Sequence, residues 1–391
     1  MNYNFDKIID RRGTNSLKYD FAVERGKPAD ILPLWVADMD FQTAPEIRDA
    51  LAEAVRHGIY GYSESKDDYF KAVYNWYKDR FQWKVKKEWL VKTPGIVFAI
   101  SAAVRALTAE GDGVLIQKPV YYPFSHIILK NKRKLINNPL IYKDGAYHID
   151  FEDFEAKIKN NQVKLFILCS PHNPVGRVWT EDELTKLGDI CMKYQVKIIT
   201  DEIHSDFIYP GHLHTVFTNI KEEYLDHTVV CTAPSKTFNL AGLQVSNLFI
   251  ANKEMRKKIQ EEIDLTGYSQ LNTMGLIACQ VAYEKGAPWL EELKVYLKGN
   301  LDFVRSFIAE QIPQIKLVEP EGTYLVWLDC TALNLNEAEL ENLVTNKAKL
   351  WLDGGTMFGQ EGLGFQRVNI ACPRSILEKA FMQLAKAIRE L

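Results

Sequence analysis

Short apolar runs recur from about residue 110 to residue 250 and alternate with amphipathic segments. Runs of strand length occur at Val114–Ile116, Leu165–Cys169, Lys197–Thr200, Thr228–Thr232 and Asn247–Ala251. Helical patterns lie between several of them, such as Glu181–Tyr194, where Leu184, Leu187, Ile190 and Cys191 share one face. Strands without polar alternation, separated by helices of this kind, indicate βαβ units. The pattern therefore predicts an α/β fold whose mainly parallel sheet is covered by helices on both faces.

The pattern changes after about residue 286. It predicts in turn a helix, a strand, a helix, a strand and a final helix, at Trp289–Gln311, Tyr324–Leu328, Asn336–Ala348, Arg367–Ala371 and Ile376–Leu391. This order is typical of a smaller α+β domain. The segment before Thr43 has no helical pattern, and we expect it to pack against the smaller domain. We therefore predict a large domain over 44–287 and a small domain formed by 1–43 and 288–391.

Composition narrows the class of protein. The 391 residues include 48 Lys and Arg against 51 Asp and Glu, for a formal net charge of −3, which argues against a dedicated nucleic-acid binder. The longest apolar runs are far shorter than a membrane span, and the acidic, polar start does not resemble a signal peptide. Six cysteines without a CxxC pair predict neither a disulfide framework nor a zinc site. We expect a metal-free cytoplasmic protein that does not bind membranes.

Three polar stretches directly follow predicted strands: Ser170–Gly176, Asp201–Asp206 and Ala233–Asn239. Parallel sheets bind ligands at the carboxyl ends of their strands, so these stretches are candidates for a site. A lysine buried there has a lowered pKa and a nucleophilic amine, which suits Lys236 to a Schiff base. Taken singly, each stretch also has a simpler interpretation. Lys236 suits an exposed loop, Asp201 a helix cap or a metal ligand, and Asn173 a structural turn.

The three stretches occur in this order on consecutive predicted strands, and together they are specific. The chain resembles the fold-type I, pyridoxal-phosphate-dependent aminotransferase superfamily over essentially its whole length. The resemblance implies that Lys236 carries the internal aldimine of pyridoxal 5'-phosphate, that Asp201 pairs with the pyridinium nitrogen, and that Asn173 donates to the phenolic oxygen. His204 stands where the superfamily often has a tyrosine, so it is either a donor near the ring or a packing residue.

Further cofactor contacts follow from the same resemblance. Tyr121 matches the residue that stacks on the ring. The start of the predicted helix Phe98–Thr108 suits a phosphate, because its backbone N–H groups are free. The expected phosphate ligands are Gly95, Ile96 and Val97 with Ser235 and, as a further candidate, Thr237. The superfamily often has an arginine on the phosphate where this chain has Gln244.

Two residues are expected to complete the site. Tyr62 resembles the tyrosine that reaches the phosphate across a dimer interface, which implies a homodimer; the alternative is an aromatic residue at a turn. Arg367 resembles the arginine that binds the substrate α-carboxylate through its planar, always-charged fork. Arg374 competes for that role, but it stands at a predicted helix start and is better explained as structural.

Sequence motifs typical of one group within the superfamily predict the reaction. The run Leu34–Phe41, together with DEIHSDF and CPRS, looks like the cystathionine β-lyase group of the superfamily. This implies β-elimination from cystathionine, cysteine, cystine or S-alkyl cysteines to pyruvate, ammonia and a thiol, with Ala37 of that run at the substrate. Two alternatives remain open. One is an aminotransferase for a small or aromatic amino acid, and the other is a regulatory protein that modulates a transcription factor.

Overall fold

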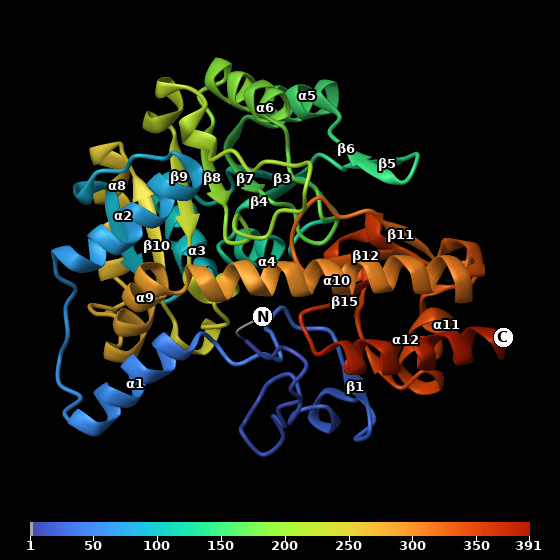
Figure 1. The fold of residues 1–391 in the computed structure, drawn as a ribbon. Coiled ribbons are helices and arrows are strands. Elements are labelled where there is room, and N and C mark those ends of the chain that lie inside the picture. The colour runs from blue at the N-terminus through green and yellow to red at the C-terminus, as the bar shows by residue number, and fades with distance from the viewer. Residues whose placement is uncertain (1–2) are drawn as a thin grey trace.

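A seven-stranded sheet forms the centre of the computed structural model, which describes residues 3–391 (Figure 1). In spatial order its strands are β2 (Leu90–Thr93), β10 (Ser246–Ile250), β9 (Thr228–Thr232), β8 (Lys197–Asp201), β7 (Val163–Cys169), β3 (Gly113–Ile116) and β4 (Lys134–Asn137). Strand β10 pairs antiparallel with both of its neighbours, whereas the pairs from β9 through β4 are parallel. The carboxyl ends of β3, β7, β8 and β9 therefore meet at one edge of the sheet.

Helices cover both faces of this sheet. Leu165 and Ile167 of β7 pack with helices α3 (Ile96–Leu107), α4 (Pro123–Lys130) and α8 (Lys253–Asp264). Phe166 and Leu168 of the same strand point to the opposite face and pack with helices α5 (Phe151–Asn161) and α6 (Glu181–Lys193). Because both faces are buried, the strands show no polar alternation. The predicted α/β fold with a mainly parallel, doubly covered sheet is confirmed.

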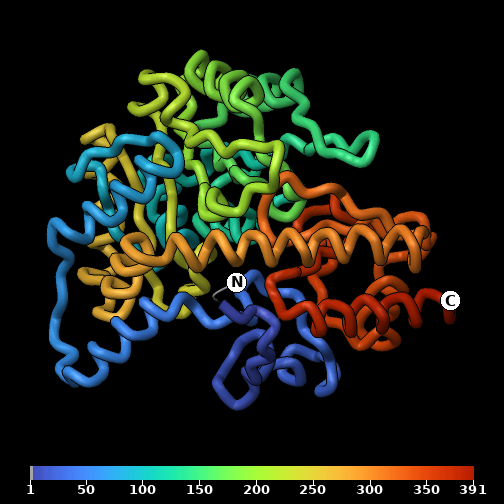
Figure 2. Tube along the Cα trace, in the orientation of Figure 1, coloured from blue at the N-terminus to red at the C-terminus, as the bar shows by residue number. Residues whose placement is uncertain are grey.

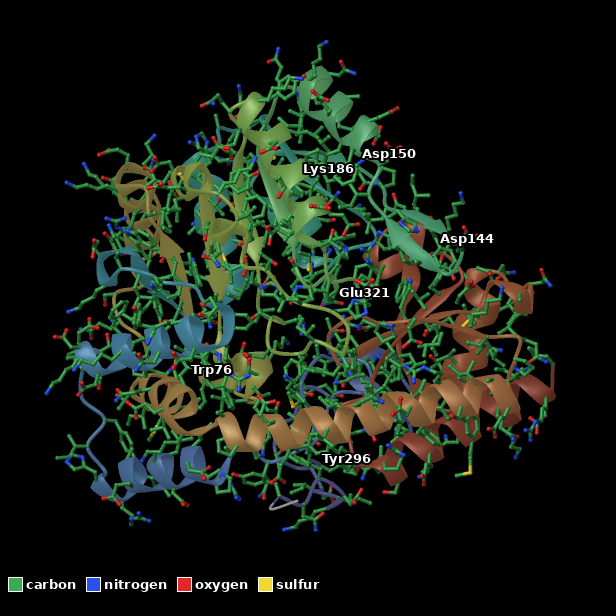
Figure 3. The ribbon with its side chains drawn as sticks, turned by 45° about the horizontal axis from the view of Figure 1, so that its top comes forward. Trp76, Asp144, Asp150, Lys186, Tyr296 and Glu321 are labelled. Carbon is green, nitrogen blue, oxygen red and sulfur yellow. The ribbon has the colours of Figure 1, made fainter. Side chains whose placement is uncertain are left out.

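The remaining elements of this part of the chain flank the sheet. They are α1 (Pro45–His57), α2 (Asp67–Phe81), α7 (Pro234–Thr237), α9 (Thr273–Lys285), and the hairpin of β5 (Ile141–Lys143) and β6 (Ala146–His148). Helices α1 and α2 both pack against α9. Figure 3 shows Asp144 at the tip of the hairpin, on the outside of the molecule.

The C-terminal part is built on a second sheet, with strand order β11 (Lys316–Val318), β12 (Leu325–Asp329), β15 (Phe365–Asn369) and β14 (Asp353–Gly354). The long helix α10 (Ala287–Gln311) runs from the large sheet to this part (Figures 1 and 2). Helices α11 (Glu337–Asn342) and α12 (Arg374–Arg389) complete it. Glu321, labelled in Figure 3, accepts a hydrogen bond from Arg177 Nε at 2.9 Å and so fastens this part to the large sheet.

The N-terminal segment packs against the C-terminal part, as the sequence predicts. Strand β1 (Leu32–Pro33) pairs parallel with β13 (Leu350–Trp351). The indole rings of Trp35 and Trp351 stack with centroids 4.3 Å apart. Figure 2 shows this segment, in dark blue, beside the C-terminal chain. The exact limits of the two domains stay a prediction.

Most predicted elements agree with the observed ones to within a few residues. The predicted helix Asn336–Ala348 differs, because α11 ends at Asn342 and a π-helical turn, Leu343–Lys347, follows it. Among the described residues, no helix is both long and apolar enough to span a membrane. Within residues 3–391, no group of three or more His, Cys, Asp or Glu side chains is arranged to hold a metal ion.

Candidate active site

A cavity of about 590 Å³ lies at the carboxyl ends of the parallel strands. Eleven predicted site residues line it: Ala37, Gly95, Ile96, Val97, Tyr121, Asn173, Asp201, His204, Ser235, Lys236 and Arg367. A second cavity of the same volume lies between α2, α10 and the loop after β8, but none of the predicted residues lines it. The candidate site is therefore the cavity at the end of the sheet.

Lys236 lies in the short helix α7, immediately after the buried strand β9. Its Nζ donates a hydrogen bond to the carbonyl oxygen of Ala37 at 2.7 Å. Burial lowers the pKa of Lys236 to about 8, although the nearby Asp38 carboxylate acts in the opposite direction. About one in ten of these amines is thus uncharged at pH 7, and the uncharged amine is the form that attacks a carbonyl.

Asp201 is the last residue of β8 and is 4% exposed. Its Oδ1 accepts a hydrogen bond from the backbone N–H of Ile203 at 3.2 Å. Burial raises the pKa of this carboxyl group to about 7, and the charge of Lys236 opposes the shift. A cationic group placed against Asp201 would stabilise its ionised form.

The first turn of α3 presents free backbone donors to the cavity. Gly95 precedes the helix, and Ile96 and Val97 begin it. A Cβ atom at Gly95 would meet no protein atom within 4 Å, so the space in front of this turn is open. Such a turn binds anions through its N–H groups and the helix dipole. The hydroxyl of Thr237 does not face this turn; it donates to Asp206 Oδ2 at 2.8 Å instead.

Arg367, on β15, is 3% exposed and reaches across to the large sheet. Its Nη1 donates to Asn173 Oδ1 at 3.0 Å, and its Nη2 donates to the carbonyl oxygen of Trp35 at 2.8 Å and to Asp353 Oδ2. Because Asn173 accepts through Oδ1, its Nδ2 remains as the donor group. The Nε–H of Arg367 is buried and has no hydrogen-bond partner. Buried donors of this kind are normally paired, so Nε indicates a place for an anionic ligand.

Tyr121 and His204 form further walls of the cavity. Burial raises the pKa of the Tyr121 phenol, so the ring stays neutral. Burial lowers the pKa of His204 well below its ordinary value, and the nearby charges of Lys236 and Arg367 lower it further. His204 is therefore a neutral imidazole, whose Nδ1 has no hydrogen-bond partner.

Two further predicted residues, like Thr237, lie outside the cavity. Tyr62 is 99% exposed and does not line the cavity of this single chain, so its place at a dimer interface stays a prediction. Arg374 is the first residue of α12, and its Nε donates to Asn300 Oδ1 at 2.8 Å. Arg374 thus has a structural partner away from the cavity, as the sequence favours.

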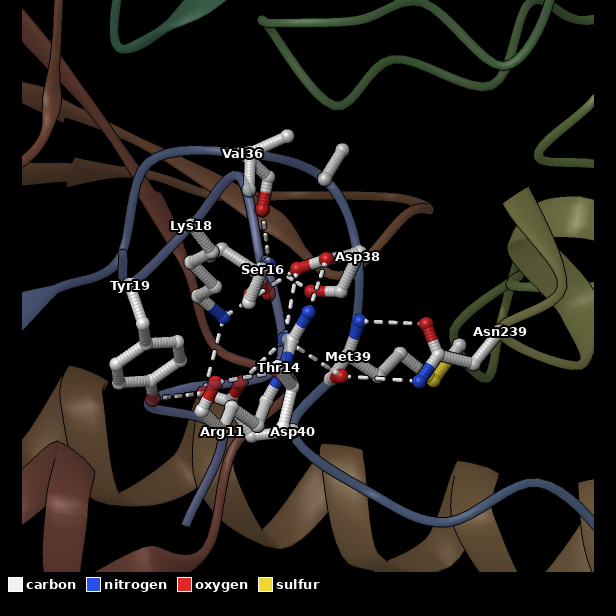
Figure 4. Close-up of polar contacts among 12 residues, drawn as sticks. Arg11, Thr14, Ser16, Lys18, Tyr19, Val36, Asp38, Met39, Asp40 and Asn239 are labelled. Carbon is white, nitrogen blue, oxygen red and sulfur yellow. Dashed lines mark hydrogen bonds and ion pairs between the residues drawn. The ribbon is translucent and has the colours of Figure 1, made fainter. Parts of the chain in front are cut away.

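A strap formed by residues 36–41 contributes Val36 and Ala37 to the wall of the cavity, and the carbonyl oxygen of Ala37 accepts the hydrogen bond from Lys236. Asn369 Nδ2 donates to the carbonyl oxygens of Val36 and Asp38, at 2.7 and 2.6 Å. Asn239 exchanges hydrogen bonds with the backbone of Met39 on the other side (Figure 4). The strap is therefore tied both to the loop that follows Lys236 and to the strand that carries Arg367.

Buried and partly buried charges hold the strap from the N-terminal side. Arg11 binds Asp38 Oδ2 at 2.6 Å and Asp40 Oδ1 at 2.8 Å. Lys18, which is fully buried, and the hydroxyl of Tyr19 both bind Asp40 Oδ2 (Figure 4). Sequence reasoning missed this cluster. The only signal was a run of alternating acids at Asp38 and Asp40 in an otherwise apolar segment.

Sequence reasoning also missed Asp353 and Tyr122, which both line the cavity. Asp353 lies in a strand of only two residues, too short to show a pattern. Tyr122 directly follows Tyr121, and adjacency to a candidate ring was the only signal for it.

The chain is similar to known proteins over nearly its whole length. Residues 29–384 match the model of the aminotransferase class I and II family. The chain is 43% identical over 385 residues to "Cystathionine beta-lyase PatB" of Bacillus subtilis, covering 98% of this chain and 100% of that protein.

Two solved structures are similar over nearly all of both chains. One is a pyridoxal-phosphate-bound putative aminotransferase from Clostridium difficile 630, with TM-score 0.97 and 46% identity, covering 99% of this chain and 100% of that chain. The other is cystalysin from Treponema denticola with a pyridoxal 5'-phosphate cofactor, with TM-score 0.96 and 40% identity, covering 100% of both chains. The chain belongs to the aminotransferase class I and II family.

Proposed function

We propose that this protein is a pyridoxal-phosphate-dependent carbon–sulfur lyase that converts sulfur amino acids to pyruvate, ammonia and a thiol. The observation that carries the proposal is the arrangement of Lys236, Asp201 and Arg367 around one cavity. The similarity to a cystathionine beta-lyase over the whole chain supports this reaction among those of the family.

The cavity fits pyridoxal 5'-phosphate. A buried lysine with a lowered pKa suits the aldehyde, and a pyridinium nitrogen would place a cation in direct contact with the buried carboxyl group of Asp201. The open space before Gly95 suits the phosphate. We propose Ile96, Val97 and Ser235 as phosphate contacts, since all of them line the same cavity. When bound, the cofactor supplies an electron sink for the bonds at the substrate Cα.

The protein's own residues then select and hold the substrate. Arg367 binds the α-carboxylate through donors that include its unpaired Nε–H. Lys236 accepts the proton from the substrate Cα, because its amine has a pKa low enough to exchange protons near neutral pH. Asp201 holds the pyridine nitrogen in its protonated form and so favours electron withdrawal from Cα. The ring of Tyr121 and the amide Nδ2 of Asn173 orient the planar cofactor.

We also propose a homodimer in which Tyr62 enters the partner's cavity. An almost fully exposed tyrosine is unusual on a free surface, and exposed Val55, Ile59 and Tyr60 lie beside it in the sequence.

The six cysteines are all buried thiols, which supports the proposal that the protein works in a reducing cytoplasm.

The test is product analysis with L-cystathionine. We expect pyruvate, ammonia and free homocysteine without any added oxo acid. Lys236→Ala should lose at least about a hundredfold in turnover, because general base catalysis alone contributes about 10²–10⁴-fold. The control is Lys157→Ala, which removes a partly exposed lysine of α5 that does not line the cavity. Turnover that requires 2-oxoglutarate and yields no thiol would replace the lyase with the aminotransferase alternative.

A further inference from the structure

Asp353 lies directly opposite Arg367 in the small sheet. Strands β14 and β15 are antiparallel, and their register pairs Asp353 with Arg367. Side chains of directly opposed residues share one face of a sheet and lie within contact distance. Both side chains are 3% exposed, and the carboxylate Oδ2 forms an ion pair with Nη2 of the guanidinium.

Most N–H donors of Arg367 already form hydrogen bonds with other residues of the chain. A guanidinium has five N–H groups, in a fixed fork. Nη2 serves Asp353 and the carbonyl oxygen of Trp35, while Nη1 serves Asn173. The Nε–H has no partner. Asp353 thus shares Nη2 with Trp35, and the Nε–H is the donor left for a ligand.

The charges that line the cavity limit what a ligand can carry. Among the described residues that line it, the cations are Lys236 and Arg367, and the carboxylates are Asp201 and Asp353. Lys236 is committed to the cofactor in the proposed function. Once the α-carboxylate of a ligand binds Arg367, this guanidinium is paired with two carboxylates, that of the ligand and that of Asp353. A second carboxylate on the substrate side chain would find no cation in this chain's lining.

We propose that Asp353 is a specificity-determining residue, which holds Arg367 for a single α-carboxylate and disfavours amino acids with an anionic side chain. The inference rests on the proposed function in taking Arg367 as the carboxylate site. It narrows the substrate class to amino acids with neutral or zwitterionic side chains. Like charges brought together at a binding site are unfavourable, and this repulsion is a general means of rejecting the wrong ligand.

The test compares two ligands that differ by one carboxylate, L-2-aminobutyrate and L-aspartate. Equilibrium dissociation constants are measured on the holoenzyme by the change in cofactor absorbance and by calorimetry. The wild type should bind L-2-aminobutyrate at least about tenfold more tightly, which corresponds to about 1.4 kcal/mol. In Asp353→Asn, an isosteric change that keeps an acceptor for Nη2, this preference should fall by at least about tenfold through tighter binding of L-aspartate.

Two variants are the controls. Asp353→Glu keeps the charge and should retain the preference. Asp329→Asn removes another buried carboxylate of the same sheet, one that binds Tyr142 and Thr331 away from the cavity, and should also retain it. If Asp353→Asn weakens both ligands equally, Asp353 only orients Arg367 and the proposal is wrong. If Asp353→Asn does not fold, a wild type without the preference still overturns it.

The outcome is separable from that of the proposed function. If cystathionine yields pyruvate but the preference does not respond to Asp353→Asn, only the specificity inference fails. If the preference responds but no thiol is released, only the lyase reaction fails.

Discussion

The low pKa of Lys236 predicts how fast the cofactor-free protein captures pyridoxal 5'-phosphate at each pH. Only the uncharged amine attacks the aldehyde. The perturbation is therefore a change of pH, applied to the cofactor-free protein. We expect the capture rate to rise about tenfold per pH unit below pH 8 and to level off above it.

The magnitude follows from the burial of the side chain. With a pKa of about 8, about one Lys236 amine in ten is uncharged at pH 7. An ordinary lysine with a pKa of about 10.4 would have only about four in ten thousand uncharged at that pH. Capture at pH 7 should thus be about two orders of magnitude faster than for an unperturbed lysine of equal access.

The assay is stopped-flow absorbance of cofactor capture from pH 6 to pH 11. The cofactor itself titrates in this range, so the same series is recorded with n-butylamine. Dividing the n-butylamine rates by the uncharged fraction of that amine gives the pH dependence of the cofactor, and dividing the protein's rates by it isolates the lysine. Asp38→Asn serves as a second perturbation. The Asp38 carboxylate raises the pKa of Lys236, so its removal should move the midpoint to lower pH.

A midpoint near that of n-butylamine would refute the reasoning, because the lysine would then be solvated rather than buried. A shift to higher pH in Asp38→Asn would equally contradict the assigned effect of that carboxylate.

Four further predictions concern three single residues. Asp201→Asn should make the cofactor-free protein more stable above pH 7. The folded-state pKa of about 7 exceeds the unfolded value of about 3.9, so the wild type loses stability as the pH rises between these two values, by about 4 kcal/mol in all. Urea unfolding at pH 5 and pH 8 should detect about 3 kcal/mol of this loss in the wild type and none in the variant. The same variant should lose about 10²–10³-fold in turnover, and retained turnover would contradict the pyridinium role. Gly188→Ala should destabilise the folded protein by about 1–3 kcal/mol, because the added Cβ would lie 2.4 Å from Cζ of Tyr224. Gly61→Ala is the control, since its Cβ would meet no atom within 4 Å, and thermal unfolding compares the two variants. Arg367→Lys should keep the cofactor and lower kcat/KM about ten- to a hundredfold, and an unchanged kcat/KM would remove Arg367 from the carboxylate site.

The amino-acid sequence by itself determined the central sheet and much of the site. A parallel strand buried on both faces is a short apolar run, so Thr228–Thr232 is predicted with the bounds that the structure has. Asp201 and Lys236, the residues with candidate chemistry, stand at or just after the ends of such strands. Because the carboxyl ends of neighbouring parallel strands meet, their convergence on one cavity follows from local sequence and the topology of βαβ units.

Only the tertiary structure decided how the other segments complete the cavity. Lys236 donates to the carbonyl oxygen of Ala37, which is far away in the sequence, and this contact depends on how the N-terminal segment packs between the two parts. The pairing of Asp353 with Arg367 depends on the register of a two-residue strand. A shift of one residue would turn Asp353 to the opposite face, and no local pattern fixes that register. The pKa of Lys236 has the same origin, since burial is a property of the assembled fold and not of the residues on either side of the lysine.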